Sequence, residues 1–154
     1  MMKNNMKRTV LTALVLVLCL CLCACGEKTE EETLSLMEKL RSGVHTEGLS
    51  DQPADFLGEL TGLEMADYTE TVYMESSDGM GASCVIALRG KDAAAAENAE
   101  KLLENYRQLR MEETRDYLPE EYKLLNSASV GRKGNTVVLV VGGHAAEDTA
   151  LLLK

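Results

Sequence analysis

The chain is poor in the residues that most often mark chemistry. Among 154 residues it has no tryptophan, one phenylalanine and two histidines. It also lacks HExxH, GxSxG and phosphate-loop motifs, which are common signatures of metalloproteases, hydrolases and nucleotide-binding enzymes. With so few aromatic residues, the core must consist mainly of aliphatic side chains. We therefore predict no catalytic residue, no cofactor and no metal ligand, and expect that the protein is not an enzyme.

Basic side chains are in the minority. The chain has 16 Lys+Arg against 25 Asp+Glu, a net charge of -9. Lys3, Lys7 and Arg8 lie in the first 24 residues, which contain no acid, so the remainder carries a net charge of -12. Such a surface repels phosphate backbones and anionic lipid headgroups. We therefore expect no nucleic-acid partner, and no membrane contact that depends on basic side chains.

The first 25 residues have the layout of a secretory signal. After the cationic leader, residues 10–25 are apolar except for Thr12. This run is shorter than the roughly 20 residues that a spanning helix needs. An uncleaved transmembrane anchor is the alternative, but the run ends at small residues and not at a basic flank. We predict that residues 1–24 are a signal peptide.

The end of this run, Leu22-Cys23-Ala24-Cys25-Gly26, resembles the lipobox of bacterial lipoproteins. In that motif the lipid-accepting cysteine follows a small residue, and an aliphatic residue stands two positions further back. The resemblance implies cleavage before Cys25 and attachment of acyl chains such as palmitate to Cys25. Two or more such chains give a stable anchor. We therefore expect a lipid-anchored protein on the extracytoplasmic face of the cell membrane.

The other cysteines support this interpretation. Cys19, Cys21 and Cys23 alternate with apolar residues, so one residue separates each pair. Zinc sites usually have two to four residues between paired cysteines and bring in distant ligands. The leucines before Cys21 and Cys23 are too bulky for the cleavage position. The fifth cysteine, Cys84, then has no partner for a disulfide, and we expect a buried free thiol and not a nucleophile.

Residues 25–32 form a short tether rich in glutamate, and a run of like charge stays solvated. Residues 33–154 are expected to form a single domain. Helices are predicted from Thr33 to Gly43, after Pro53 up to Gly62, and over residues 93–117, 119–125 and 145–153. Asp92 is expected to cap the longest of them. Its predicted apolar stripe, which could alternatively face a partner helix, comprises Ala95, Ala99, Leu102, Tyr106 and Leu109.

Strands are predicted over residues 68–75, 83–89, 128–132 and 136–141, the first two as a β-hairpin. In the second strand, Cys84, Ile86 and Leu88 should face the core, with Ala87 on the other face. The last strand has no polar interruption between Val137 and Val141, so both of its faces should be covered. The order β-β-α-β-β-α predicts an α+β fold, with helices packed on a small antiparallel sheet of about four strands.

Three segments together resemble an uncharacterised lipoprotein family of clostridial bacteria, the domain of unknown function 4358. They are the hairpin from Val72 to Leu88, the helix end Arg115-Asp116-Tyr117-Leu118-Pro119-Glu120-Glu121-Tyr122, and Gly134-Asn135-Thr136-Val137-Val138-Leu139-Val140-Val141. The similarity covers residues 60–145. It implies a surface lipoprotein without a known activity, so it assigns no functional residue beyond Cys25.

Three functions are compatible with these observations. The first is a non-catalytic module that binds a protein or another component of the cell envelope. The second is a lipoprotein that binds a small ligand or a cation through its acidic surface. The third is an enzyme with an unrecognised site, which would require a pocket that holds His144 or Cys84 beside a carboxylate.

Overall fold

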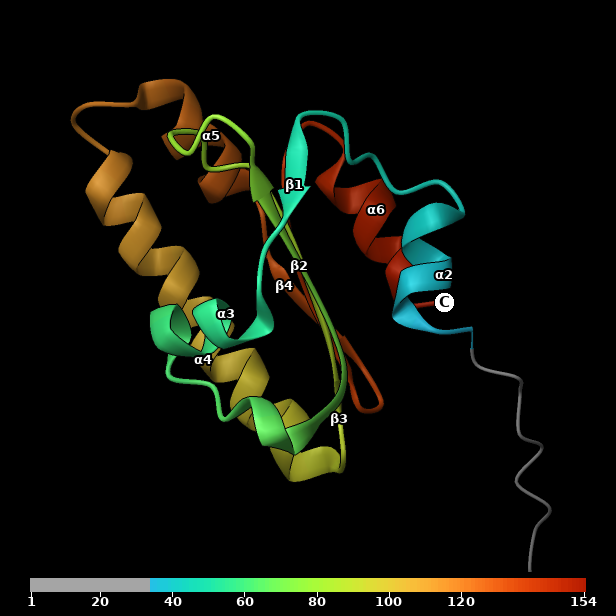
Figure 1. The fold of residues 1–154 in the computed structure, drawn as a ribbon. Helices are drawn as coiled ribbons and strands as arrows, with labels where there is room; N and C mark the ends of the chain where they lie inside the picture. Colours follow the sequence, from blue (N-terminus) through green and yellow to red (C-terminus); the bar gives the residue numbers. More distant parts are fainter. Residues whose placement is uncertain (1–33) are drawn as a thin grey trace, which may run out of the picture. The chain divides into compact units, whose positions relative to one another are not determined.

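Figure 1 shows the fold in a computed structural model, which describes residues 34–154. The predicted signal peptide, Cys25 and the tether lie outside the described residues. Leu34–Lys154 forms one compact unit. Within these residues, no helix combines the length and the apolar character that crossing a membrane requires.

The fold is built on an antiparallel sheet of five strands, in the order β1-β2-β3-β5-β4. In chain order the strands are β1 (Leu49–Asp51), β2 (Tyr68–Ser76), β3 (Cys84–Gly90), β4 (Val130–Lys133) and β5 (Thr136–Val141). The four predicted strands are present. β1 is an additional edge strand with three residues, too short for an alternating pattern to reveal it.

Helices cover both faces of this sheet (Figure 1). The elements are α2 (Leu36–Arg41), α3 (Ala54–Thr61), the short 3₁₀ helix η1 (Met65–Asp67), α4 (Ala93–Thr114), α5 (Pro119–Ser127) and α6 (Ala145–Leu152). α3, α4 and α5 lie on one face, whereas α2 and α6 lie on the other. The predicted α+β class is therefore confirmed, with helices on both sides.

Two cores result from this arrangement, one on each face of the sheet. Ile86, Leu88 and Leu139 point into the core beneath α4, whereas Ala87 and Val138 point into the core beneath α2 and α6. The prediction that both faces of β5 are covered is confirmed. Ala87 lies on the face of β3 opposite to Ile86, as predicted. That face is buried as well, and Ala87 is 0% exposed, because α2 and α6 cover that side.

The longest helix, α4, begins as predicted. Asp92 caps it by accepting a hydrogen bond from the backbone N–H of Ala95 at 2.8 Å. The helix ends at Thr114, three residues before its predicted end. Its buried apolar positions are Ala96, Ala99, Leu103 and Met111. Part of the predicted stripe is therefore wrong, because Leu109 is 58% exposed and the sheet covers the neighbouring row of apolar residues.

The helix α2 starts at a capping box. Ser35 accepts from the backbone N–H of Glu38 at 3.1 Å, and the Glu38 carboxylate accepts from the backbone N–H of Ser35 at 2.8 Å. The hydrogen bonds of this box lower the pKa of Glu38. Thr33, the predicted start of this helix, lies outside the described residues.

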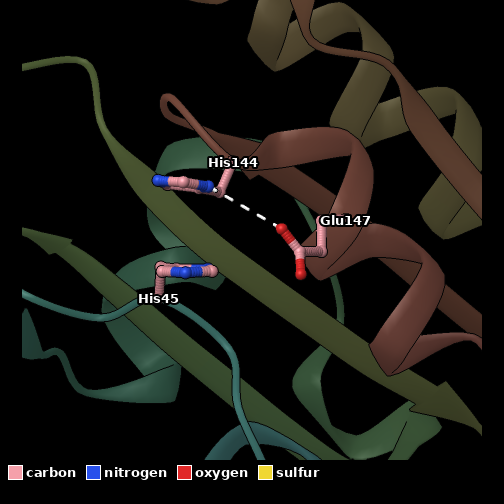
Figure 2. A group of neighbouring side chains, drawn as sticks. All are labelled: His45, His144 and Glu147. Carbon is pink, nitrogen blue, oxygen red and sulfur yellow. Dashed lines mark ion pairs between the residues drawn. The ribbon is translucent and has the colours of Figure 1, made fainter.

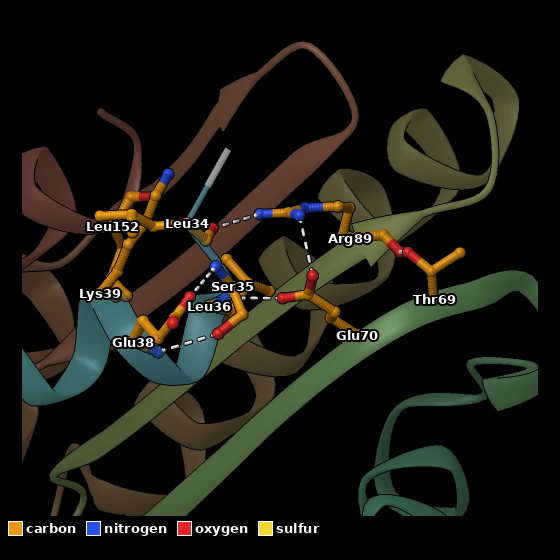
Figure 3. A network of polar contacts seen from close by, with 9 residues as sticks. All are labelled: Leu34, Ser35, Leu36, Glu38, Lys39, Thr69, Glu70, Arg89 and Leu152. Carbon is orange, nitrogen blue, oxygen red and sulfur yellow. Dashed lines mark hydrogen bonds and ion pairs between the residues drawn. The ribbon is translucent and has the colours of Figure 1, made fainter. Parts of the chain in front are cut away.

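The start of the described chain is also tied to the sheet (Figure 3). Arg89 on β3 pairs with Glu70 on β2 at 2.8 Å and donates to the carbonyl of Leu34 at 3.1 Å. Glu70 accepts a further hydrogen bond from the backbone N–H of Leu36. A charge pair that bridges two strands therefore holds the entry to α2.

Candidate functional site

One hollow among the described residues lies between α3, α4 and the loop that joins β2 to β3. It encloses about 290 Å³, and the side chains of Phe56, Leu60 and Leu109 form its apolar walls. These three side chains are 39%, 43% and 58% exposed. Apolar groups that stay this accessible and gather around one hollow are typical of a binding surface. We call this hollow the α3–α4 groove.

Tyrosines lie in and behind the wall of the α3–α4 groove. Tyr106 lines it, and burial raises the pKa of Tyr106 to about 12. The hydroxyl of Tyr73 donates to Glu75 at 2.6 Å, and the rings of Tyr73 and Phe56 are tilted with centroids 6.4 Å apart. Burial likewise raises the pKa of Tyr73. Both phenols therefore stay neutral at physiological pH.

Charged groups stand at the edge of the α3–α4 groove. Glu75 and Glu113 line it together with Arg110, which pairs with Glu113 at 3.2 Å. Two carboxylates and one guanidinium leave the edge with a net negative charge. The hollow therefore combines apolar walls with an acidic rim.

The second hollow, of about 160 Å³, lies on the opposite face of the sheet. His45, from the loop after α2, meets His144, the N-cap residue of α6, at this hollow. The two rings stack with centroids 3.9 Å apart and an interplanar angle of 13° (Figure 2). Glu147 lies 3.8 Å from Nδ1 of His144. Two histidines far apart in the sequence thus share one site with a carboxylate.

Asp148 fixes the position of His45. Its side chain is buried, and one carboxylate oxygen lies 2.9 Å from Nδ1 of His45 and accepts from the His45 backbone N–H at 3.2 Å. This hydrogen bond is the main reason that the pKa of His45 is raised. Ser83 also lines this hollow, but among residues 34–154 no hydrogen bond joins Ser83 to either histidine.

The family model described as Domain of unknown function (DUF4358) matches residues 43–142, well over half of the chain. The protein belongs to the DUF4358 family. No curated protein and no solved structure matches the chain. The match begins earlier than the resemblance in the sequence indicated.

The two hollows differ in whether the residues that form them lie inside the range matched by the DUF4358 model. Every residue that lines the α3–α4 groove falls inside the matched range. The histidine site extends past the end of the range, because His144, Glu147 and Asp148 follow residue 142. The groove therefore belongs to the region that defines the family, whereas the histidine site includes a part beyond it.

Sequence reasoning missed two features of this DUF4358 protein. The first is the contact between His45 and His144, which only the packing of α6 beside the loop after α2 brings together. The second is the contact of Glu121 on α5, which accepts a hydrogen bond from the backbone N–H of Ala82 at 2.6 Å and so fastens the β2–β3 loop to α5. Neither contact has a sequence signal.

Cys84 is buried and free, as predicted. Burial raises the pKa of its thiol to about 12, so the reactive thiolate is scarce at pH 8. We expect a water-soluble aromatic disulfide reagent to leave Cys84 unmodified in the native protein and to react fully after unfolding in guanidinium. Absorbance of the released thiolate measures both rates. Equal rates in the native and unfolded protein would show that Cys84 is accessible and would reopen the nucleophile hypothesis.

Proposed function

We propose that this protein is a non-catalytic binding module, held by lipid on Cys25 at the extracytoplasmic face of the cell membrane, as in a clostridial surface lipoprotein. The observation that carries the binding role is the α3–α4 groove, where apolar side chains of two helices stay accessible around one hollow. The lipobox-like sequence before Cys25 supports the anchor. The DUF4358 family has no defined activity, so the binding role must be tested on this protein directly.

The shape and charge of the groove favour a protein segment as its occupant. Phe56 and Leu60 lie one helical turn apart on α3 and face Leu109 across the hollow. Such walls receive one or two apolar side chains of a partner helix or strand. Glu75 and Glu113 at the rim, and the acidic surface as a whole, favour basic residues beside those apolar anchors. The partner is thus an envelope protein that presents an apolar segment flanked by Lys or Arg.

Replacing Leu109 by lysine tests this role of the groove. The substitution removes an exposed apolar contact and places a positive charge where the partner is expected to carry its own. Central interface residues of this kind cost about 2 kcal/mol or more, roughly a thirtyfold loss of affinity. The detergent-solubilised full-length protein is used as bait in envelope extract, and the affinity of each retained protein is then measured for the wild type and the variant.

Tyr117→Lys is the matched control. Tyr117 is 85% exposed, follows the same helix and does not line the groove. This variant adds the same charge and should bind as the wild type does. If Leu109→Lys and Tyr117→Lys retain the same proteins with the same affinities, the groove is not the binding surface. Failure to retain any protein reproducibly would contradict the binding role itself.

A further inference from the structure

The second site has the donor atoms of a metal site. We propose that His45, His144 and Glu147 bind one divalent transition-metal ion, with zinc the best fit. One potential ligand atom from each residue lies within 4.8 Å of the others. Figure 2 shows the three side chains gathered at the beginning of α6. This site is independent of the α3–α4 groove, so either can fail without the other.

The types of donor atom select the class of ion. Two imidazole nitrogens and one carboxylate oxygen are a common ligand set for zinc, and a water completes the tetrahedron. Calcium requires six to eight oxygen ligands, and magnesium prefers an octahedral shell of oxygens and water. A site with two histidines therefore discriminates against both of these ions.

Asp148 supplies the support that metal-binding histidines usually have. Its carboxylate, 2.9 Å from Nδ1 of His45, holds the ring proton on that nitrogen. Nε2 of His45 then carries the lone pair and is the ring nitrogen left to bind a metal ion. The Asp148 oxygen also accepts from the His45 backbone N–H at 3.2 Å, which fixes the loop. Asp148 is only 2% exposed, so it is a positioning residue and not a ligand.

The local charges favour a cation. The N-terminus of α6 carries a partial positive charge, which by itself would repel a bound cation. Glu147 and Asp148 lie in the first turn of that helix, and Glu47 lines the same hollow. Three carboxylates around two imidazoles outweigh the partial charge of a single helix end.

Binding requires one local rearrangement. The rings of His45 and His144 are nearly parallel, and the in-plane lone pairs of parallel rings do not converge on one ion. His45 is held by Asp148, whereas the side chain of His144 is 58% exposed. The His144 ring can therefore rotate about its side-chain bonds without disturbing the core.

The proposal is tested by titrating the full-length protein in detergent with zinc and recording the heat of binding by isothermal titration calorimetry. We expect one zinc ion per chain, bound in the presence of excess Ca²⁺. His144→Ala removes an exposed ligand and should weaken zinc binding by at least about tenfold. Loss of a residue that merely supports a ligand already costs about that much. Glu147→Gln should weaken it as well, whereas Glu112→Gln, an exposed carboxylate on α4, should have no effect.

The results that would overturn the proposal are equally distinct. They are absence of zinc binding, displacement of zinc by equimolar Ca²⁺, or equal affinity of wild type and His144→Ala. Asp148→Asn should lower the zinc affinity by about ten- to a hundredfold. It should also change the tautomer of His45, which ¹⁵N NMR of the imidazole ring reports. If Asp148→Asn does not fold, the exposed His144 and Glu147 variants still decide the question.

Discussion

Replacing Cys25 by alanine is expected to abolish acylation of the protein completely. The thiol of Cys25 is the only group in the lipobox-like segment with the correct small residue before it, and alanine offers no nucleophile. Cells fed a labelled fatty acid should incorporate the label into the wild type and not into the variant. The intact mass of the native wild type should equal residues 25–154 plus the attached lipid.

Cys23→Ala is the control for this experiment, because it removes a neighbouring thiol and leaves Ala24 and Cys25 in place. This variant should be labelled like the wild type. A native mass that begins at Met1, or a Cys25→Ala variant that still takes up label, would contradict the lipid anchor. The first result would favour an uncleaved membrane segment, and the second would place the lipid on another residue.

The second large effect is on stability. Ile86→Ala should lower the free energy of unfolding by about 2–5 kcal/mol, because a fully buried side chain leaves a cavity in a packed core. Ile86 is 0% exposed and lies on β3, the central strand, in the core beneath α4. Denaturant unfolding of a chain that starts after Cys25, followed by far-UV circular dichroism, measures the loss.

Two further substitutions show whether that loss comes from packing. Ile86→Val removes one methylene and should cost about 0.5–1.5 kcal/mol. Met80→Ala, in the loop between β2 and β3, should change stability by less than about 0.5 kcal/mol, since Met80 is 75% exposed. Equal effects of Ile86→Ala and Met80→Ala would mean that the two-sided sheet is not the stabilising core.

Element boundaries could be predicted wherever one residue has a local physical effect. Asp92 accepts a hydrogen bond from one free backbone N–H in the first turn of α4, Pro119 begins α5, and Gly62 ends α3 at a positive φ of 78°. The apolar run of β5 likewise indicated a strand covered on both faces. These signals depend on neighbours in the sequence, so one sequence was enough to read them.

Features that depend on distant packing could not be predicted. β1 has three residues and exists because it pairs with the end of β2. The exposure of Leu109 depends on which of two adjacent apolar rows of α4 the sheet covers. The approach of His45 to His144 depends on where the chain folds α6 against the loop after α2. The candidate metal site was therefore invisible in the sequence, although the residue types were present.

The clamp of Arg89 and Glu70 on the backbone at Leu34 and Leu36 has a mechanical consequence. Under the lipid anchor that we propose, tension would enter the described domain at Leu34, where Arg89 of β3 and Glu70 of β2 hold the backbone. This clamp would share the load with β2 and β3 and would oppose separation of the start of α2 from the sheet.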